Sequence, residues 1–271
     1  MRRAAPTIAL AALLLTACDP APGPTPPPSP TLTAPATDTA QLVAAIRTAI
    51  AQAPSATFTI DASLGTTGKS STGALSFDGQ TCNLTMTFDG TEIRVLGKKT
   101  YTHPRQAAIP GKPWLGTDPD NPDIYAQMAA AAVPLLAELP DLGRALTEID
   151  RAGRIVSANQ TTLRDQPANH YRLEIDAARA PDLFPEFAQP PVDGKPAPPV
   201  TAKLPAELWL DTADRPARFT IDLSPGFPPA AADAAVKGTT DYRDWGDPVE
   251  ITAPPADQVA DLSELIKKIG A

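Results

Sequence analysis

The residue types that most often carry enzyme chemistry are few in this sequence and lie far apart. Its two histidines, His103 and His170, stand in no recognisable catalytic motif. The sequence holds neither a Gly-x-Ser-x-Gly elbow nor a His-Glu-x-x-His zinc motif. Gly68-Lys69-Ser70 is similar to the end of a phosphate-binding loop, but the first glycine of that motif would fall at Ser63 and no helix is expected to follow. We interpret the segment as a hairpin loop and predict no catalytic residue and no enzyme activity.

Metal and cofactor binding also have little support in the sequence. Cys82 cannot form a metal site alone, and the alternating pattern around it indicates a buried position. Asp118, Asp120 and Asp123 are interspersed with prolines, which is typical of a loop. We therefore predict no metal site and no cofactor.

One cysteine has a context that indicates covalent modification. The apolar run from Ile8 to Leu15 follows the basic pair Arg2-Arg3 and is far shorter than the roughly 20 residues of a membrane span. This pattern is typical of a secretory signal. The sequence Leu15-Thr16-Ala17-Cys18 resembles the lipobox of bacterial lipoproteins, in which the cysteine sulfur receives a diacylglycerol and the chain is cut just before it. An ordinary signal peptide is the alternative, and both the Sec and the Tat export routes stay open.

The lipobox resemblance divides the chain into three expected parts. Residues 1–17 are the lipoprotein signal peptide, residues 18–37 are the lipidated cysteine with a proline-rich disordered tether, and residues 38–271 are a single domain. Such a tether favours extended polyproline II structure. Two acyl chains on Cys18 are enough for stable anchoring. The domain is thus expected at the extracytoplasmic face of the cell membrane, lipid-anchored.

Charge and cysteine content limit what the domain can bind. The formal net charge is −8 and becomes about −10 once Arg2 and Arg3 are removed with the signal. An acidic body disfavours nucleic acid and electrostatic docking onto anionic lipid. Because Cys82 is the only cysteine after residue 18, no internal disulfide can form and a packed core must hold the domain together. We expect a monomer that contacts the membrane through its acyl anchor and binds no nucleic acid.

An amphipathic helix is predicted to open the folded part, with strands after it. Asp38 is a good N-cap for a helix that Pro54 ends. From Ser55 onward apolar and polar residues alternate with a period of two, and Asp-Gly turn dipeptides at residues 78–79 and 89–90 separate the runs. This pattern predicts an antiparallel meander with one apolar face.

Helical periodicity returns in the middle of the chain and at its end. Residues 124–139 predict a helix that Pro134 interrupts, and residues 142–149 predict a short second helix. Residues 258–269 predict an amphipathic C-terminal helix. The proline-rich segment 177–205 is not expected to supply central strands. The remaining strands are predicted at residues 155–163, 170–175, 207–210, 218–223 and 238–242.

The order of helix, strands, central helices and strands lacks the strict alternation of a doubly wound parallel sheet. We predict an α+β fold in which a single large, curved antiparallel sheet has helices packed on its concave apolar face. Eight apolar side chains are expected on its concave side, where they either line a ligand cavity or only pack against one another. They are Phe58, Ile60, Leu84, Met86, Phe88, Trp114, Met128 and Leu135.

Two further stretches carry a family resemblance. The first is Glu207-Leu208-Trp209-Leu210-Asp211, followed by Arg215-Pro216. The second, nearer the C-terminus, is Tyr242-Arg243-Asp244-Trp245-Gly246-Asp247-Pro248-Val249 with Ala253-Pro254-Pro255. Together with the lipobox, the tether and the N-terminal helix, they resemble the actinobacterial lipoproteins of the LppX and LprG group, among the LolA-like and LolB-like carriers. The resemblance extends over about residues 38–263.

The resemblance implies a LolA-like fold, in which a half-open barrel of antiparallel strands wraps around central helices, and it also implies a function. It implies a membrane-anchored lipoprotein that binds a lipid or lipoglycan in an apolar cavity and serves lipid transport in the cell envelope. The alternative is an envelope sensor or accessory lipoprotein whose collapsed barrel binds a protein partner. The proline-rich insertion at residues 181–205 and the C-terminal helix exceed the family pattern, and either can cap or fill the cavity mouth.

Overall fold

The structure, a computed structural model, describes most of the predicted domain. It describes residues 32–64, 67–107, 109–118, 120, 139–184, 187, 199–227 and 236–261. The predicted signal peptide, Cys18, most of the tether, the helix predicted from residue 124 with Met128 and Leu135, and residues 262–271 lie outside the described residues. Within the part that is described, no helix is both long and apolar enough to cross a membrane.

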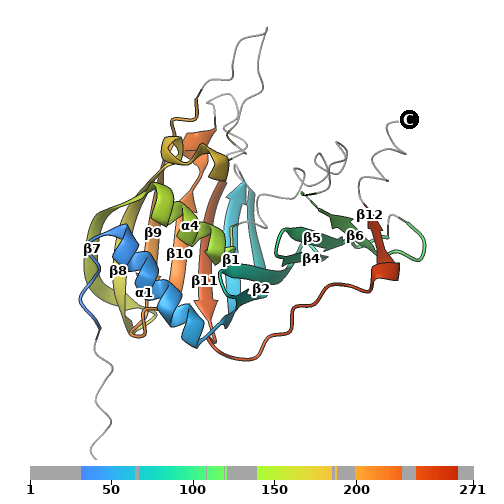
Figure 1. Ribbon diagram of the computed structural model, residues 1–271, viewed down its shortest axis with the longest axis horizontal. Helices are drawn as coiled ribbons and strands as arrows, with labels where there is room; N and C mark the ends of the chain where they lie inside the picture. The colour runs from blue at the N-terminus through green and yellow to red at the C-terminus, as the bar shows by residue number, and fades with distance from the viewer. Residues whose placement is uncertain are drawn as a thin grey trace, which may run out of the picture. The chain divides into compact units, whose positions relative to one another are not determined.

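The described strands form one 12-stranded sheet, ordered β12-β6-β5-β4-β3-β2-β1-β11-β10-β9-β8-β7 (Figure 1). Neighbouring strands are antiparallel except β12 and β6, which are parallel. This sheet and its helices confirm the predicted α+β class. The strands are β1 (Ser55–Leu64), β2 (Thr67–Asp78), β3 (Thr81–Phe88), β4 (Thr91–Leu96), β5 (Lys99–His103), β6 (Trp114–Thr117), β7 (Gly153–Leu163), β8 (Gln166–Asp176), β9 (Lys203–Leu210), β10 (Pro216–Asp222), β11 (Val236–Arg243) and β12 (Val259–Asp261).

Two α-helices, α1 (Thr39–Gln52) and α4 (Leu142–Ala152), pack on one face of the sheet (Figure 1). Asp38 caps α1 as predicted, because its Oδ1 accepts a hydrogen bond from the Gln41 backbone N–H at 2.8 Å. Asp141 caps α4 in the same way and accepts from the Arg144 N–H at 3.1 Å. Both helices bury their apolar stripes, which for α1 consist of Leu42, Val43, Ile46, Ala49 and Ile50.

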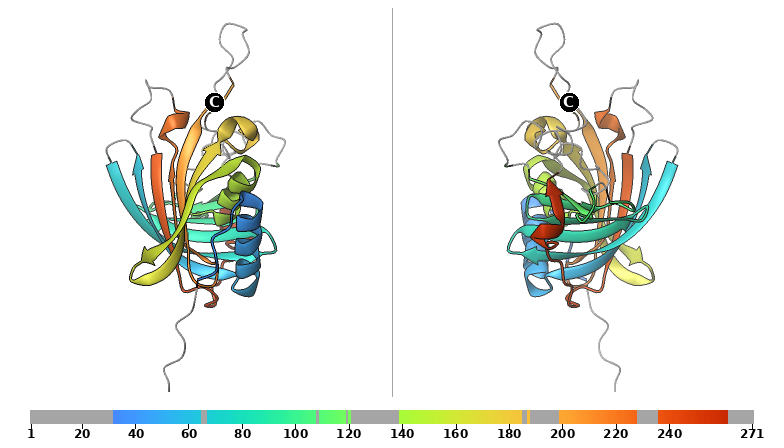
Figure 2. Two further views of the ribbon diagram at one scale, coloured as in Figure 1. Left: turned by 90° about the vertical axis from the view of Figure 1, so that its left-hand side faces the viewer. Right: turned by 90° about the vertical axis from the view of Figure 1, so that its right-hand side faces the viewer.

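The sheet curls around α4. This helix contacts β3 on one side and β7 and β8 on the other, although β2, β1, β11, β10 and β9 lie between β3 and β8 in the sheet. Figure 2 shows the curl from its two sides. The approach to β3 is close because Gly143 has no side chain: a Cβ there would lie 3.1 Å from the Cβ of Cys82. The predicted wrapping of the sheet around a central helix is thus present.

The strand register gives the sheet an apolar concave face and a polar convex face. Phe58 lies opposite Gly73, and Gly73 lies opposite Met86, so these residues point to the same face. Side chains on this face join those of α1 and α4 in one core cluster. Its members on the strands include Phe58, Ile60, Leu75, Leu84, Met86, Ile93, Tyr171, Leu173, Leu208, Phe219 and Ile221.

Residues 32–38 run from the end of the sheet to the start of α1. The Thr33 carbonyl accepts hydrogen bonds from Asn169 Nδ2 at 3.1 Å and from Gln160 Nε2 at 3.2 Å. The Ala36 N–H donates to the Tyr171 hydroxyl at 2.9 Å. The chain therefore enters the domain beside β7 and β8.

Three local predictions need correction. Gly68-Lys69-Ser70 is not a loop but part of β2, where it pairs with residues 61–63 of β1. Pro205 lies inside β9, a central strand between β8 and β10. One proline removes a single donor and its φ suits extended backbone, so the ladder continues through it. Val259–Asp261, expected to begin a helix, form β12 because β6 offers them a parallel partner.

We predict that Gly73→Ala destabilises the fold. A Cβ at residue 73 would lie 2.3 Å from the Thr85 carbonyl oxygen and 2.4 Å from Cζ of Phe58. Such overpacking should lower the free energy of unfolding by about 1–3 kcal/mol, as measured by urea denaturation. Gly68→Ala, in the same strand, is the matched control: a Cβ there would meet nothing within 4 Å, so the change should be less than about 0.5 kcal/mol. Equal effects of the two substitutions would contradict the packing at Phe58.

Candidate functional site

The concave interior holds most of the described side chains that were predicted to face it. Phe58, Ile60, Leu84 and Met86 are at most 3% exposed and belong to the main core cluster. Phe88 is partly buried and packs against that cluster. Their ligand-binding role stays a prediction, since residues that only pack together would show the same burial.

Trp114, by contrast, does not face the interior. The pairing of β6 with β5 sets Leu115 opposite Thr102, and the pairing of β5 with β4 sets Thr102 opposite Ile93. Ile93 in turn lies opposite Met86. Leu115 therefore shares the concave face with Met86, and Trp114, one residue earlier, points to the convex face.

The Trp114 ring is covered by polar side chains on that convex face. Cζ of Arg94 lies 4.6 Å from the centroid of the indole ring, and the His103 ring meets it edge-on with centroids 4.9 Å apart. Arg94 Nη1 also donates to the Thr252 carbonyl at 2.9 Å. Trp114 thus helps to hold the segment after β11 against the outside of the sheet.

A small cleft lies in the interior between α4 and β10. Its volume is about 20 Å³, roughly the space for one water molecule. Apolar side chains of β10 form one wall and the sheet-facing side of α4 forms the other. The lining residues are Leu139, Asp141, Arg144, Ala145, Glu148, Phe219, Ile221 and Leu223. Side chains thus nearly fill the space between α4 and β10.

The α4 side of this cleft carries an ion pair. Arg144 Nε lies 2.8 Å from Glu148 Oε1, and the Glu148 residue is only 4% exposed. Arg144 Nη2 also donates to the Leu183 carbonyl at 3.0 Å. Removing such a pair from water costs several kcal/mol of desolvation free energy per ion, so charged side chains are unfavourable in the wall of a closed core. The residue patterns considered above do not include this pair, although its i, i+4 spacing on an amphipathic helix is a detectable signal.

Titratable groups beside the N-terminus of α4 have raised pKa values. Burial raises the pKa of the Asp141 carboxyl, and the hydrogen bond from the Arg144 N–H offsets this only in part. Burial also raises the pKa of the Cys82 thiol, and the nearby Asp141 charge adds to the effect. The Tyr242 hydroxyl, whose pKa burial likewise raises, donates to the Pro140 carbonyl at 3.4 Å. A thiol held in its neutral form is a poor nucleophile, so Cys82 is suited to packing in the core rather than to covalent chemistry.

An aromatic cluster lies beside the 3₁₀ turns Pro181–Leu183 and Ser224–Gly226. We call Phe184, Phe187 and Phe227 the aromatic plug. The rings of Phe184 and Phe187 are stacked with centroids 5.7 Å apart, and Phe227 meets Phe187 edge-on at 5.2 Å. Phe184 and Phe187 belong to the predicted insertion 181–205, and two phenylalanines three residues apart in a proline-rich segment are the sequence signal for the plug.

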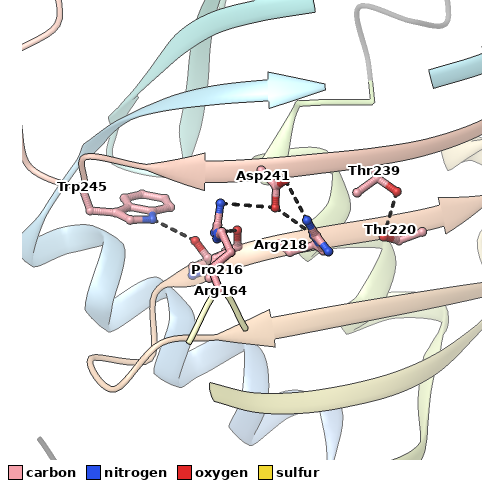
Figure 3. A network of polar contacts seen from close by, with 8 residues as sticks. Arg164, Pro216, Arg218, Thr220, Thr239, Asp241 and Trp245 are labelled. Atoms are coloured by element: carbon pink, nitrogen blue, oxygen red, sulfur yellow. Dashed lines mark hydrogen bonds and ion pairs between the residues drawn. The ribbon is translucent and has the colours of Figure 1, made fainter. Parts of the chain in front are cut away.

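The convex face carries an ordered network of polar side chains (Figure 3). Arg218 Nε and Nη2 contact the two carboxylate oxygens of Asp241 at 2.8 and 2.9 Å, and Arg164 Nη1 lies 3.5 Å from the same carboxylate. Trp245 Nε1 donates to the Pro216 carbonyl at 2.8 Å. Burial alone would raise the pKa of Asp241, but the hydrogen bonds and charge of Arg218, with further help from Arg164, hold it below its ordinary value. The network ties β10 and β11 together on the outside.

We predict that Asp241→Asn lowers the free energy of unfolding at about pH 7 by about 1–3 kcal/mol, because it removes charge-assisted hydrogen bonds. Since the pKa of Asp241 is depressed by folding, its stabilising effect is present above the ordinary value of 3.8 and is lost as the pH falls through the lower folded pKa. Chemical denaturation at several pH values should show the two proteins converging in acid. Asp78→Asn, at an exposed position, is the control, and a difference that persists at about pH 2 would refute the linkage.

A wider hollow of about 410 Å³ lies outside the interior, between β5, β6, β12 and residues 253–256. Its lining includes Tyr101, Pro254 and Val259, and an ion pair of Lys99 with Asp118 at 3.2 Å. Among the described residues, no three His, Cys, Asp or Glu side chains gather in a way that could hold a metal ion. The described lining of the hollow therefore offers no metal site.

No known protein family and no curated protein matches the sequence. Solved structures are similar to it. LprF from Mycobacterium bovis has 16% sequence identity and a TM-score of 0.44, over 83% of this chain and 100% of that chain. The lipoprotein LppX from Mycobacterium tuberculosis has 13% identity and a TM-score of 0.42, over 79% and 99%. A LolA-superfamily protein from Nitrosomonas europaea has 10% identity and a TM-score of 0.32, over 81% and 96%.

At these identities and TM-scores the likeness carries no conclusion about family, and the resemblance to the LppX and LprG group and to LolA-like proteins stays a prediction from the sequence. The identities are low, and the likeness concerns the arrangement of the chain. It does not identify a ligand, whose nature has to follow from the residues themselves.

Proposed function

We propose that this protein is an envelope lipoprotein that binds the apolar chains of a lipid or lipoglycan between the concave face of its sheet and its helices. The observation that supports the proposal is the continuous apolar surface from β4 to β8, which forms one core cluster with α1 and α4. Apolar chains would bind there by burial of methylene groups, at about 0.8 kcal/mol each.

The proposed location follows from the first residues of the sequence. Cys18 carries the acyl anchor, the residues between Cys18 and Thr33 are the tether, and the single domain that follows lies at the extracytoplasmic face of the membrane. The acidic net charge supports this arrangement, because it leaves the acyl chains as the means of attachment. The entry of the chain beside β7 and β8, through the hydrogen bonds of Thr33, gives the tether a defined point of departure.

A second function is favoured by one observation. The cleft between α4 and β10 has a volume of only about 20 Å³, whereas ligand pockets usually measure about 300–1,000 Å³. An interior that stays closed at this point would suit an accessory lipoprotein that binds a protein partner through its surface. The two functions differ in whether apolar chains enter the interior, and this can be measured directly.

The proposal predicts that the full chain, produced in an actinobacterial host and extracted in mild detergent, carries a co-purifying lipid of defined mass in native mass spectrometry. A fluorescent palmitate analogue should also bind saturably. Ala145→Leu, which adds bulk to the buried wall of the cleft, should weaken this binding at least about tenfold, because overpacking leaves less room for the chain.

Ala213→Leu makes the same change at an exposed turn and should leave the affinity unchanged. Circular dichroism would verify that both variants are folded. Absence of both a co-purifying lipid and saturable binding would count against the lipid proposal and favour the protein partner.

A further inference from the structure

We propose that the aromatic plug is a built-in occupant of the apolar site, and that the Phe187 ring takes the place of a ligand's apolar end. This inference rests on the proposed function. It assigns to the start of the insertion 181–205 a direct role in limiting which apolar chains the interior accepts.

The Phe187 ring packs closely against Gly226, Phe184 and Phe227. A Cβ at Gly226 would lie 2.2 Å from Cζ of Phe187, so only glycine at this position leaves room for the ring. Phe184 stacks on one side of the ring and Phe227 meets it edge-on, geometries that aromatic pairs favour. Phe187 is 6% exposed and Phe184 is fully buried. Two chain segments about 40 residues apart thus combine to hold one ring.

The plug adjoins the interior cleft through residues on both of its segments. Leu183, which directly precedes Phe184, accepts the hydrogen bond from Arg144 on the α4 wall of the cleft. Leu223 lines the cleft and accepts through its carbonyl from the Gly226 N–H at 3.0 Å. The plug and the cleft are thus linked through Leu183 and Leu223, and Phe184, Phe187 and Leu223 belong to one core cluster.

Close packing explains why the plug would compete with a ligand. Protein interiors have few voids, so an apolar chain can enter a filled core only where a side chain leaves it. The plug belongs to two connecting segments, Pro181–Phe184 with Phe187 and Ser224–Phe227, and not to the strand ladder. Displacing the ring would open the cleft without breaking a strand pair.

The test compares Phe187→Ala with wild type in the full chain, using two probes. The fluorescent palmitate analogue should bind the variant at least about tenfold more tightly, because the competing ring is gone. Benzene should raise the Tm of the variant and not of wild type, since an apolar cavity left by a ring can take up benzene. Gly226→Ala keeps Phe187, but the added Cβ would clash with its ring and displace it. This variant should therefore also bind palmitate more tightly than wild type.

Tyr101→Ala is the control, because it removes a ring that lines the hollow outside the interior and should not tighten binding. Phe187→Leu serves if the alanine variant does not fold. Unchanged or weaker palmitate binding, with benzene bound to the variant, would overturn the role of the plug and leave the proposed function intact. No palmitate binding by any of the proteins, with benzene bound to Phe187→Ala, would overturn the proposed function and this inference together.

Discussion

The described structure depends on the close approach of one helix to two distant parts of a single sheet. α4 lies close to β3 because Gly143 has no side chain to keep them apart. At its other end α4 continues directly into β7, since Gly153 follows Ala152 without a loop. A flat sheet could not contact the helix on both sides, so the curl is the condition under which the apolar faces of α1, α4 and the strands share one core. The position of the cleft and the plug follows from this geometry.

The spacing of apolar residues, with a period of two in strands and 3.6 in helices, predicts the class of fold and the inward direction of Phe58, Ile60, Leu84 and Met86. The residue type of Asp38 before the first helix predicts the α1 cap. The direction of Trp114 depends on how β6 pairs with β5, and a strand of four residues is too short to reveal this by alternation. The position of the Phe187 ring depends on its contact with Gly226. This contact joins two connecting segments far apart in the chain, so no periodic pattern in the sequence predicts it.

Charge is arranged differently on the two faces of the sheet. Outside, Asp241 meets two arginines in a partly hydrated network where hydrogen bonds outweigh the cost of burial. Inside, burial is the larger effect and raises the pKa of Asp141. The Arg144–Glu148 ion pair also lies on this side, beside apolar side chains of β10. The outer network links β10 and β11 where water can reach it, whereas the inner pair places two charges beside apolar side chains.

The hydrogen bonds of Thr33 have a mechanical consequence. A force on the chain before Thr33 is first resisted by the contacts of this residue. The Thr33 carbonyl accepts from the side-chain amides of Asn169 and Gln160, and its hydroxyl donates to Asp214 Oδ1 at 3.1 Å. Ala36 and the Tyr171 hydroxyl come next, ahead of the turns of α1. A pull on the chain before Thr33 would therefore break these hydrogen bonds before it strains the sheet.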